Sequence, residues 1–494
     1  MKKIVLLLLL LVFARSATHA EKRFEFTDDA RKAYKSATSL HFQEASLVLS
    51  RMKSQDKDNL IALHIENYID FLSLYLNQNP QEYKRLKTNK ENRIAQIKAG
   101  NPQSPYYLFV QADIRLQWAL VALRFGEYVN AFQDISRAYK LLQKNQQKFP
   151  DFILNKKDLG ILHALVGTIP DNYRWGAKLL GGLKGTIAQG KQEIEQVLQY
   201  AHRADFLFEE ETIVLYAFIL LDLENKGEKA WKAIQAATWQ PTENAMHCFI
   251  LSTIAMRTGR NDQAIALLES RPQGQGFMSF PMLDFMLGIA KLRRLDSDAG
   301  QYLSAFVQHF KGENGIKDAY QKLAWHALLQ GDKASYSRYI KSLQNKGKAE
   351  TGADKNALQE AKSGLIPDVS LLKARLLFDG GYFQKAYQQL QEKTAADFAH
   401  SQNQLEYLYR MGRILHGLKR YKEAITYYEK TIEQGRYKPS FYACNAALQT
   451  GLIYETLEQV PEARKYYTLC LEINPAEYKS ELHQKAKSGM SRLK

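Results

Sequence analysis

The chain repeats itself near its C-terminal end, and tandem repetition constrains a fold more strongly than any single motif does. Residues 407–433 align with residues 443–475 at an offset of 39 positions. The matched positions hold small residues or tyrosine: Gly412 and Gly451, Ala424 and Ala463, Tyr428 and Tyr467. Because a small residue lets two helix backbones approach closely, each copy predicts a pair of packed antiparallel helices.

Weaker copies of this unit extend over the rest of the chain. A small residue stands in the place of Ala424 at several earlier positions: Ala45, Ala131, Ala230, Ala264, Gly300, Ser335 and Ala386. From Ala230 to Ser335 the successive spacings are 34, 36 and 35 residues. Strand patterns with period-two alternation and Asn-Gly or Asp-Gly turns are scarce. The sequence therefore predicts an all-α fold, an α-α solenoid of stacked helical hairpins.

The unit resembles the tetratricopeptide repeat, a helix-turn-helix motif with a period of about 34 residues and the same small, aromatic and closing proline positions. The resemblance is best for residues 404–475, where Pro475 closes the second copy. It implies a superhelix whose first helices line a concave face, with a protein or peptide as the partner bound there.

A second resemblance covers residues 159–198, which look like a signature of eukaryotic tetratricopeptide-like proteins related to the inclusion-body clearance protein. The pattern is carried by Gly160, Pro170, Leu180, Gly182, Gly185, Gly190 and Leu198. It implies shared helical architecture, a lipid- or membrane-associated scaffolding role, and no catalytic residues. Proline ends a helix, and glycine permits close approach or positive φ. We therefore expect a structural turn formed by Pro170, Gly181, Gly182 and Gly185.

Residues 185–192, GTIAQGKQ, fall one residue short of the G-x-x-x-x-G-K-[ST] phosphate loop. A phosphate loop needs a strand before it and a hydroxyl after its lysine, where that hydroxyl holds magnesium. Here the preceding residues have helical spacing, and Gln192 stands at the hydroxyl position. Nucleotide binding is not expected.

Composition divides the chain into five parts. The predicted parts are a signal peptide (1–20), an N-terminal region of atypical hairpins (21–203), middle repeats (204–343), a linker (344–364) and a C-terminal repeat block (365–494). In the fourth part Gly, Lys and Ala replace aromatic residues. This segment is interpreted as a linker or as a weakly packed helix.

The N-terminus has the features of a secretory signal. Lys2 and Lys3 precede an apolar run over 4–14, and small residues allow cleavage after Ala20. At helical rise this run covers about 17 Å, whereas a bilayer core is about 30 Å thick, so the alternative of a retained anchor is disfavoured. No cysteine follows the cleavage site to carry a lipid. We expect a periplasmic or secreted protein that is not a lipoprotein and has no transmembrane span after cleavage.

The chain is basic, with a net charge of +16, and removal of the three basic residues in 1–20 leaves +13. Basic blocks at 84–98 and 479–494 would attract an anionic glycan, a lipid surface or nucleic acid. Acidic residues are interspersed throughout, which favours a solvated surface. An anionic glycan or envelope surface is the second partner class that we consider, and nucleic acid is not expected.

Motifs for catalysis and metal binding are absent from the sequence. It contains no H-E-x-x-H, G-x-S-x-G or C-x-x-C, and its 11 histidines are scattered. His163 is interpreted as a core residue, and the glutamates at 209–211 as a helix start. We expect no enzyme activity, no cofactor and no metal. Cys444 and Cys470 should lie at adjacent ends of two antiparallel helices, either as a disulfide or as packed thiols.

The predicted partner-binding residues are Arg375, Phe378, Tyr409, Arg413 and His416. Each arginine follows a small packed residue, Ala374 or Gly412, and should project from a first helix into the concave face. Guanidinium groups with aromatic rings suit an acidic peptide or an anionic glycan, although such arginines also commonly solvate an exposed face. The sequence thus favours an exported scaffold or adaptor for a protein or peptide. The alternative is a helical protein that binds a glycan, a lipid or the envelope surface.

Overall fold

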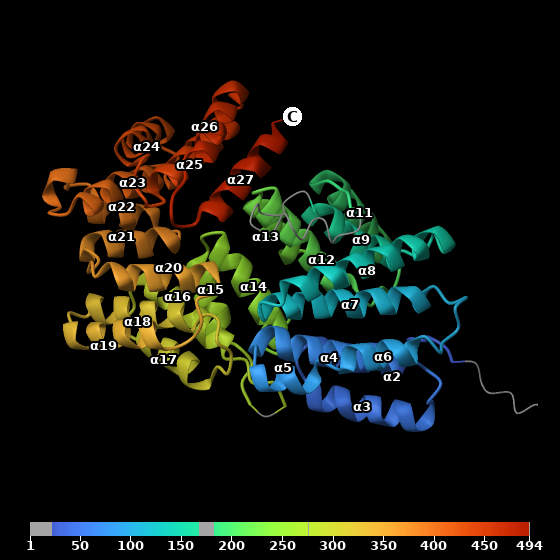
Figure 1. Ribbon diagram of the computed structural model, residues 1–494. Helices are drawn as coiled ribbons and strands as arrows, with labels where there is room; N and C mark the ends of the chain where they lie inside the picture. The colour runs from blue at the N-terminus through green and yellow to red at the C-terminus, as the bar shows by residue number, and fades with distance from the viewer. Residues whose placement is uncertain (1–21, 167–181, 275, 494) are drawn as a thin grey trace, which may run out of the picture.

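The computed structural model describes residues 22–166, 182–274 and 276–493, and the regular secondary structure of these residues is helical apart from one isolated bridge between Arg23 and Asn59. Figure 1 shows the helices stacked pairwise along a curved path from the blue N-terminal part to the red C-terminal part. The prediction of an all-α solenoid is confirmed. In the ranges described, no helix combines the length and the apolar character needed to cross a membrane.

The N-terminal part contains paired antiparallel helices and further helices packed between them. Its helices are α2 (Asp28–Thr38), α3 (Phe42–Gln55), α4 (Ile61–Asn77), α5 (Pro80–Leu86), α6 (Asn89–Ile97), α7 (Tyr106–Arg124), α8 (Tyr128–Lys148), α9 (Leu154–Val166) and α11 (Ile187–Ala201). Helices α2 and α3 form one pair, α7 and α8 a second, and α9 and α11 pack closely as a third, while α4 packs against both α2 and α7.

The middle part is a more regular series of hairpins. Its helices are α12 (Glu209–Phe218), α13 (Gly227–Gln235), α14 (Ala245–Arg257), α15 (Asn261–Glu269), α16 (Met282–Arg294), α17 (Ala299–His309), α18 (Ile316–Leu329), α19 (Lys333–Asn345) and α20 (Gly352–Ser363). A π-helical turn, Ile219–Leu223, continues α12. The glutamates at 209–211 begin α12, as expected from the favourable interaction of acidic side chains with a helix N-terminus.

The C-terminal part holds three hairpins and a closing helix. Its helices are α21 (Val369–Asp379), α22 (Phe383–Leu390), α23 (Ser401–Gly417), α24 (Tyr421–Gly435), α25 (Tyr442–Thr456), α26 (Val460–Glu472) and α27 (Lys479–Arg492). A 3-10 turn, Ala395–Asp397, connects α22 to α23. Helices α21, α23 and α25 pack side by side, and we call the surface that they form together with α18 the first-helix face.

The small residues identified in the repeats have the predicted place in the hairpins. Every position of the series, from Ala45 to Ala463, lies on the second helix of a hairpin, and all of its alanines are fully buried. On the first helices, a Cβ added at Gly412 would lie 2.6 Å from the Tyr428 ring, and one at Gly451 would lie 2.6 Å from the Tyr467 ring. The glycine on one helix therefore makes room for the tyrosine on its partner.

Residues 344–364 were interpreted as a linker or a weakly packed helix, and the structure shows a packed helix. Helix α20 contacts α18 and α19 and buries Ala357 and Ala361. Thr351 caps its first turn by accepting a hydrogen bond from the Asp354 N–H. Asp354 is itself buried and accepts hydrogen bonds from the backbone of α18. Small alanines suit this helix because it packs directly against two neighbours.

The near-match to a phosphate loop is the start of a helix. Thr186 caps α11, and Gly190 lies within that helix rather than in a loop. A Cβ on Gly190 would collide with the backbone of Gly160, so these two glycines let α9 and α11 approach closely. The side chain of Lys191 forms an ion pair with Glu224 at 2.9 Å. The glycines of this stretch therefore serve helix packing.

The predicted turn around residue 182 is only partly described. Gly182 has φ of +87°, as expected for a glycine in a turn, and a Cβ on Gly185 would lie 2.5 Å from the His163 Cα. Pro170 and Gly181 lie outside the described residues. His163 is buried, and its Nδ1 lies 2.7 Å from a Glu193 carboxylate oxygen, as expected for a core histidine with a polar partner.

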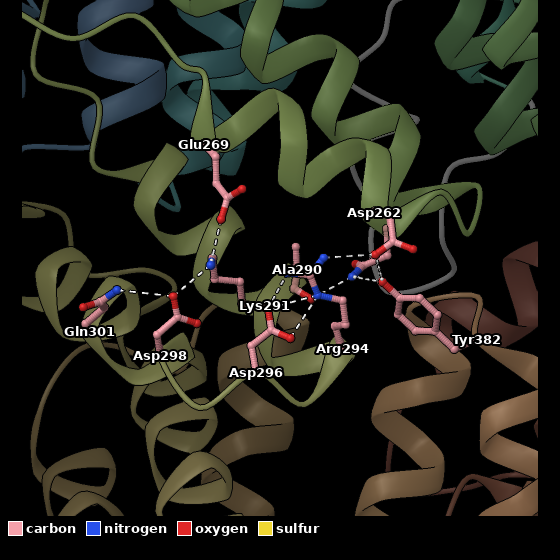
Figure 2. Close-up of polar contacts among 10 residues, drawn as sticks. Asp262, Glu269, Ala290, Lys291, Arg294, Asp296, Asp298, Gln301 and Tyr382 are labelled. Carbon is pink, nitrogen blue, oxygen red and sulfur yellow. Dashed lines mark hydrogen bonds and ion pairs between the residues drawn. The ribbon is translucent and has the colours of Figure 1, made fainter.

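A polar cluster joins the middle repeats to the C-terminal hairpins. Figure 2 shows Tyr382, just before α22, directed toward Asp262 near the start of α15, and its hydroxyl donates a 2.7 Å hydrogen bond to that carboxylate. Arg294 of α16 also contacts Asp262 at 3.2 Å. Beside them the turns at Gly259 and Gly381 are so close that a side chain on Gly381 would meet the Gly259 carbonyl. The C-terminal hairpins are thereby attached to the middle ones through contacts far apart in sequence.

Candidate functional site

Two arginines on the first-helix face lie over aromatic rings of the preceding first helix. The guanidinium carbon of Arg375 on α21 is 4.4 Å from the centroid of the Trp325 ring on α18. That of Arg413 on α23 is 4.6 Å from the centroid of the Phe378 ring on α21. The same cation–π contact thus recurs in successive hairpins and links three first helices.

Hydrogen bonds continue this arrangement onto α25. The Tyr409 hydroxyl accepts hydrogen bonds from Arg413 Nη1 at 2.8 Å and from Asn445 Nδ2 at 2.7 Å. The Tyr409 side chain is only 1% exposed, so its ring packs between helices and presents no face to a ligand. The sequence placed this tyrosine correctly beside Arg413, but it did not show that close packing of the first helices covers the ring.

The remaining predicted residues lie in different surroundings. Phe378 is half-buried under Arg413 and also contacts the ring of Phe383. His416 lies one turn further along α23 and packs against the rings of Tyr421 and Tyr428. Burial and the charge of Arg413 lower the pKa of His416 to about 4, so this imidazole is neutral at physiological pH. The structure therefore brings Phe378, Tyr409 and Arg413 into direct contact, while His416 faces the second helix of its own hairpin.

A cavity of about 390 Å³ opens beside Arg375 on the first-helix face. Its walls come from α18, α20, α21 and α23, together with the loops at 365–368, 438–441 and 477–478. Of the five residues predicted for partner binding, only Arg375 lines it. The volume lies within the range of about 300–1,000 Å³ that is typical of ligand sites.

Sequence reasoning missed three carboxylates in this cavity. Glu360 on α20, Glu406 on α23 and Glu477 in the loop before α27 all line it. They are far apart in the sequence and belong to no common motif. Only the stacking of the hairpins, together with the return of the chain after α26, brings them to one place.

The carboxylates differ in how far they are neutralised. Glu406 accepts two hydrogen bonds from Arg410, at 2.9 and 2.7 Å. Glu360 accepts hydrogen bonds from the Trp325 indole at 2.7 Å and from the Gln321 amide at 2.8 Å. The Arg375 guanidinium is 3.9 Å from this carboxylate. No lysine or arginine of the described ranges forms an ion pair with Glu477.

The pKa values reflect this incomplete neutralisation. Burial raises the pKa of Glu360, against the effect of Arg375, and the charge of Glu406 adds to the rise. Burial also raises the pKa of Glu477, with Glu360 and Glu406 acting in the same direction. A carboxylate whose pKa is raised in this way gains from the arrival of a cation.

Exposed apolar side chains adjoin cavity-lining residues in the sequence. Ile366 lies between the lining residues 365 and 367, and its exposed fraction is 54%. Val369 follows the lining residue Asp368 and is 38% exposed. Tyr437 precedes the lining residue Lys438 and is 89% exposed. A protein partner bound over the cavity would cover such exposed apolar side chains and remove them from water.

The two best-defined hairpins match a known family. Residues 405–434 and 446–477 match the family model for the tetratricopeptide repeat, and they correspond to α23 with α24 and α25 with α26. These two hairpins therefore resemble tetratricopeptide repeats. The cavity therefore lies against the first helix of the first of them, on the side that we expected to be concave.

Solved structures with some similarity to this chain are tetratricopeptide-type helical proteins of low sequence identity. Human IFIT1 with m7Gppp-AAAA is 13% identical, the match covers 92% of this chain and 97% of that one, and the TM-score is 0.35. The quorum sensor NprR from B. thuringiensis is 11% identical over 90% and 97%, with a TM-score of 0.28. Yeast Tom70 is 13% identical over 95% and 97%, with a TM-score of 0.22. These TM-scores carry no conclusion about function. No curated protein sequence matches this chain.

The basic block at 84–98, outside the tetratricopeptide repeats, is partly neutralised. Arg93 is buried and forms an ion pair with Asp70 at 2.7 Å, and Lys90 forms one with Asp134 at 2.6 Å. Lys84 and Lys87 remain exposed. The block therefore exposes less positive charge to solvent than its sequence indicates, because the side chains of Lys90 and Arg93 form ion pairs within the protein.

A buried ionic cluster links α9 to the hairpins before and after it. Lys157 is 1% exposed, forms ion pairs with Asp158 and Glu211, and lies 5.5 Å above the Phe208 ring. The hydroxyl of Tyr34 on α2 donates a 3.1 Å hydrogen bond to Glu211. No group of three potential metal ligands occurs within the ranges described. Because the cluster is enclosed between packed helices, we interpret it as a structural element.

Proposed function

We propose that the protein is a non-enzymatic adaptor that binds a partner protein on the first-helix face of its C-terminal hairpins. The observation that carries this proposal is the cavity between α18 and α23, which combines incompletely neutralised carboxylates with the exposed apolar residues Ile366, Val369 and Tyr437 beside its lining residues in the sequence. Tetratricopeptide repeats flank the cavity, and their fold fits the binding of a protein partner. Covering these side chains with a partner would remove apolar surface from water.

Site-specific photo-crosslinking in the native cell tests this function. A photoreactive phenylalanine analogue would replace Gln359 or Gln402, two exposed glutamines that line the cavity. Gln384 is an equally exposed glutamine on the second helix α22 and provides the matched control. We expect one defined protein to crosslink from both cavity positions and not from the control. Crosslinking from Gln384 alone, or none from either cavity position, would contradict an adaptor role for this face.

Export is part of the same proposal. Residues 1–20, which have the features of a signal peptide, lie outside the described residues, so the support for export is the sequence pattern. The expected product begins at Glu21 and is periplasmic or secreted. N-terminal sequencing of the protein from fractionated cells would show this. A mature chain that retains residues 1–20, or that is found only in the cytoplasm, would contradict export.

Binding to an anionic glycan, a lipid or an envelope surface is the alternative proposal. The exposed lysines Lys84 and Lys87 support it, whereas the inward ion pairs of Lys90 and Arg93 reduce the available charge. Flotation with anionic vesicles and binding to an anionic polysaccharide test it. Replacement of Lys84 and Lys87 by Ala should abolish any such binding and leave crosslinking at the cavity unchanged.

A further inference from the structure

The charged groups of the cavity do not balance. Four carboxylates line it, from Glu360, Asp368, Glu406 and Glu477, against two lining cations, Arg375 and Lys438, and a third cation, Arg410, that forms an ion pair with Glu406. An excess of negative charge in a partly buried site favours a positively charged ligand. The sequence suggested the opposite, an acidic peptide or an anionic glycan, because it identified the arginine and not the surrounding carboxylates.

The Arg375 guanidinium is not available to bind a ligand carboxylate through two parallel hydrogen bonds. One face of its guanidinium covers the Trp325 ring, with a distance of 4.4 Å to the centroid. Its side chain also approaches the Glu360 carboxylate, with 3.9 Å between Nη1 and Oε2. The arginine is therefore part of the wall, and an incoming carboxylate would face Glu360, Glu406 and Glu477 beside it.

The carboxylates retain acceptor capacity toward the cavity. Asp368 is committed to capping α21, because it accepts hydrogen bonds from the backbone N–H groups of Ser370 and Leu371. Glu406 uses a single oxygen, Oε1, for both hydrogen bonds from Arg410. Glu477 has no ion-pair partner in the described ranges, and burial and the neighbouring glutamates raise its pKa against the opposing effects of a hydrogen bond from the Phe441 backbone and of the Arg375 charge. Glu406 and Glu477 are thus the carboxylates best able to receive a cation.

A further feature near the cavity fits a peptide rather than a simple ion. The exposed residues Ile366 and Tyr437 offer apolar surface beside cavity-lining residues. A basic side chain flanked by apolar residues would satisfy the interior charge and cover this apolar surface together.

We propose that this cavity binds the lysine or arginine side chain of a partner protein, from a segment with apolar residues on either side of that basic residue. The proposal rests on the adaptor function above and specifies its ligand. The ammonium or guanidinium group would lie between Glu477, Glu406 and Glu360, and the apolar neighbours would contact Ile366 and Tyr437.

Four fluorescein-labelled peptides test the proposal. Each is an acetylated heptapeptide with leucine on both sides of a central residue, and the central residue is lysine, arginine, norleucine or glutamate. Fluorescence anisotropy with the full-length mature protein should show at least tenfold tighter binding of the lysine and arginine peptides than of the norleucine peptide. Glutamate should bind most weakly. Binding of the glutamate peptide as tightly as the lysine peptide would overturn the proposal.

Variants of the cavity assign the binding to these carboxylates. Glu477→Gln, alone and with Glu360→Gln, should weaken binding of the lysine peptide at least tenfold while leaving the norleucine peptide unaffected. Glu433→Gln replaces an exposed glutamate on the second helix α24 and is the matched control. If the double variant does not fold, the single Glu477→Gln change carries the test. Equal binding of the lysine peptide by wild type and a folded Glu477→Gln variant would overturn the proposal.

The crosslinking experiment separates this inference from the adaptor function. A protein captured at Gln359 through a segment without lysine or arginine would overturn the ligand assignment and leave the adaptor role intact. A captured segment with a central basic residue and apolar neighbours, whose capture Glu477→Gln reduces, would support both. Tight binding of the lysine peptide without any capture in the cell would support the cavity's specificity and contradict the adaptor role.

Discussion

The guanidinium of Arg413 lies 4.6 Å from the centroid of the Phe378 ring and donates a 2.8 Å hydrogen bond to the buried hydroxyl of Tyr409. The Arg413 side chain is thereby hydrogen-bonded to a residue of its own helix, α23, and stacked on a ring of α21 in the preceding hairpin. Because stacked hairpins are stabilised mainly by contacts between neighbours, such a bridge contributes to the stability of the array.

Replacement of Arg413 by Ala should therefore lower the free energy of unfolding. The loss of the cation–π contact and of a charged hydrogen bond to a buried hydroxyl predicts a decrease of about 1–3 kcal/mol. Because Arg375 and Arg413 both pack over aromatic rings, replacing the two together by Ala should also lower the melting temperature. Lys422→Ala, at an exposed position of α24, is the control. Identical denaturation curves for Arg413→Ala and this control would refute the bridging role.

The packing of a glycine against a tyrosine within each of these two hairpins can be tested by adding a single methyl group. In Gly412→Ala the new methyl would lie 2.6 Å from the Tyr428 ring, a distance at which the side chain or the helix must move. We expect a loss of about 1–3 kcal/mol, as is typical of overpacked cores. Gly352→Ala at the start of α20 meets no atom within 4 Å and should be neutral or slightly stabilising. Urea denaturation measures the free energy of unfolding of both variants. Equal values for Gly412→Ala and Gly352→Ala would contradict the steric explanation.

Asp158 should give the stability of the protein a distinctive pH dependence. Burial raises the pKa of its carboxyl to about 7, with Asp113 and Glu211 acting in the same direction and Lys157 against them. An unfolded aspartate titrates near pH 3.9, so between about pH 4 and 7 the folded state binds the extra proton. The contribution of this group to stability is therefore greatest at the acidic end of that window and decreases as the pH rises toward 7.

Asp158→Asn should remove this decrease. Relative to wild type, the variant should gain on the order of 1–3 kcal/mol in unfolding free energy as the pH rises from 4 to 7. Lys157 keeps Glu211 as an ion-pair partner in the variant. Chemical denaturation at several pH values measures the difference. Parallel stability profiles for the two proteins would show that Asp158 does not titrate in this window.

The two C-terminal cysteines are neighbours, as expected from the sequence. Cys444 on α25 and Cys470 on α26 are fully buried, with 3.6 Å between their sulfur atoms, and both are free thiols in the structure. Their hydrogen bond, together with burial, raises the pKa of the Cys470 thiol, so reaction with alkylating reagents should be slow in the folded state. Thiol titration of the unreduced, unfolded protein should give three thiols, including Cys248. A count of one would show that the pair is a disulfide in the cell.

Much of the fold followed from the sequence because each hairpin is specified locally. The small residue on a second helix and the glycine–tyrosine pair within one hairpin lie within about half a repeat of each other, so periodicity is enough to detect them. The same local pattern placed Tyr409 beside Arg413 and Cys444 beside Cys470. Where aromatic residues were missing, at 344–364, the composition did not distinguish a linker from the packed helix α20.

The charge of the candidate site depended on tertiary structure. Glu360, Glu406 and Glu477 come from three separate elements and meet only because α20 packs against α18 and the chain returns after α26. The sequence by itself determined that this is an all-helical repeat protein with arginines on the first helices, since side-chain spacing along one helix sets which residues share a face. The stacking of hairpins decided which of those arginines are covered by aromatic rings and which carboxylates surround them. Burial and electrostatic interactions depend on distances in space between residues that no sequence pattern connects.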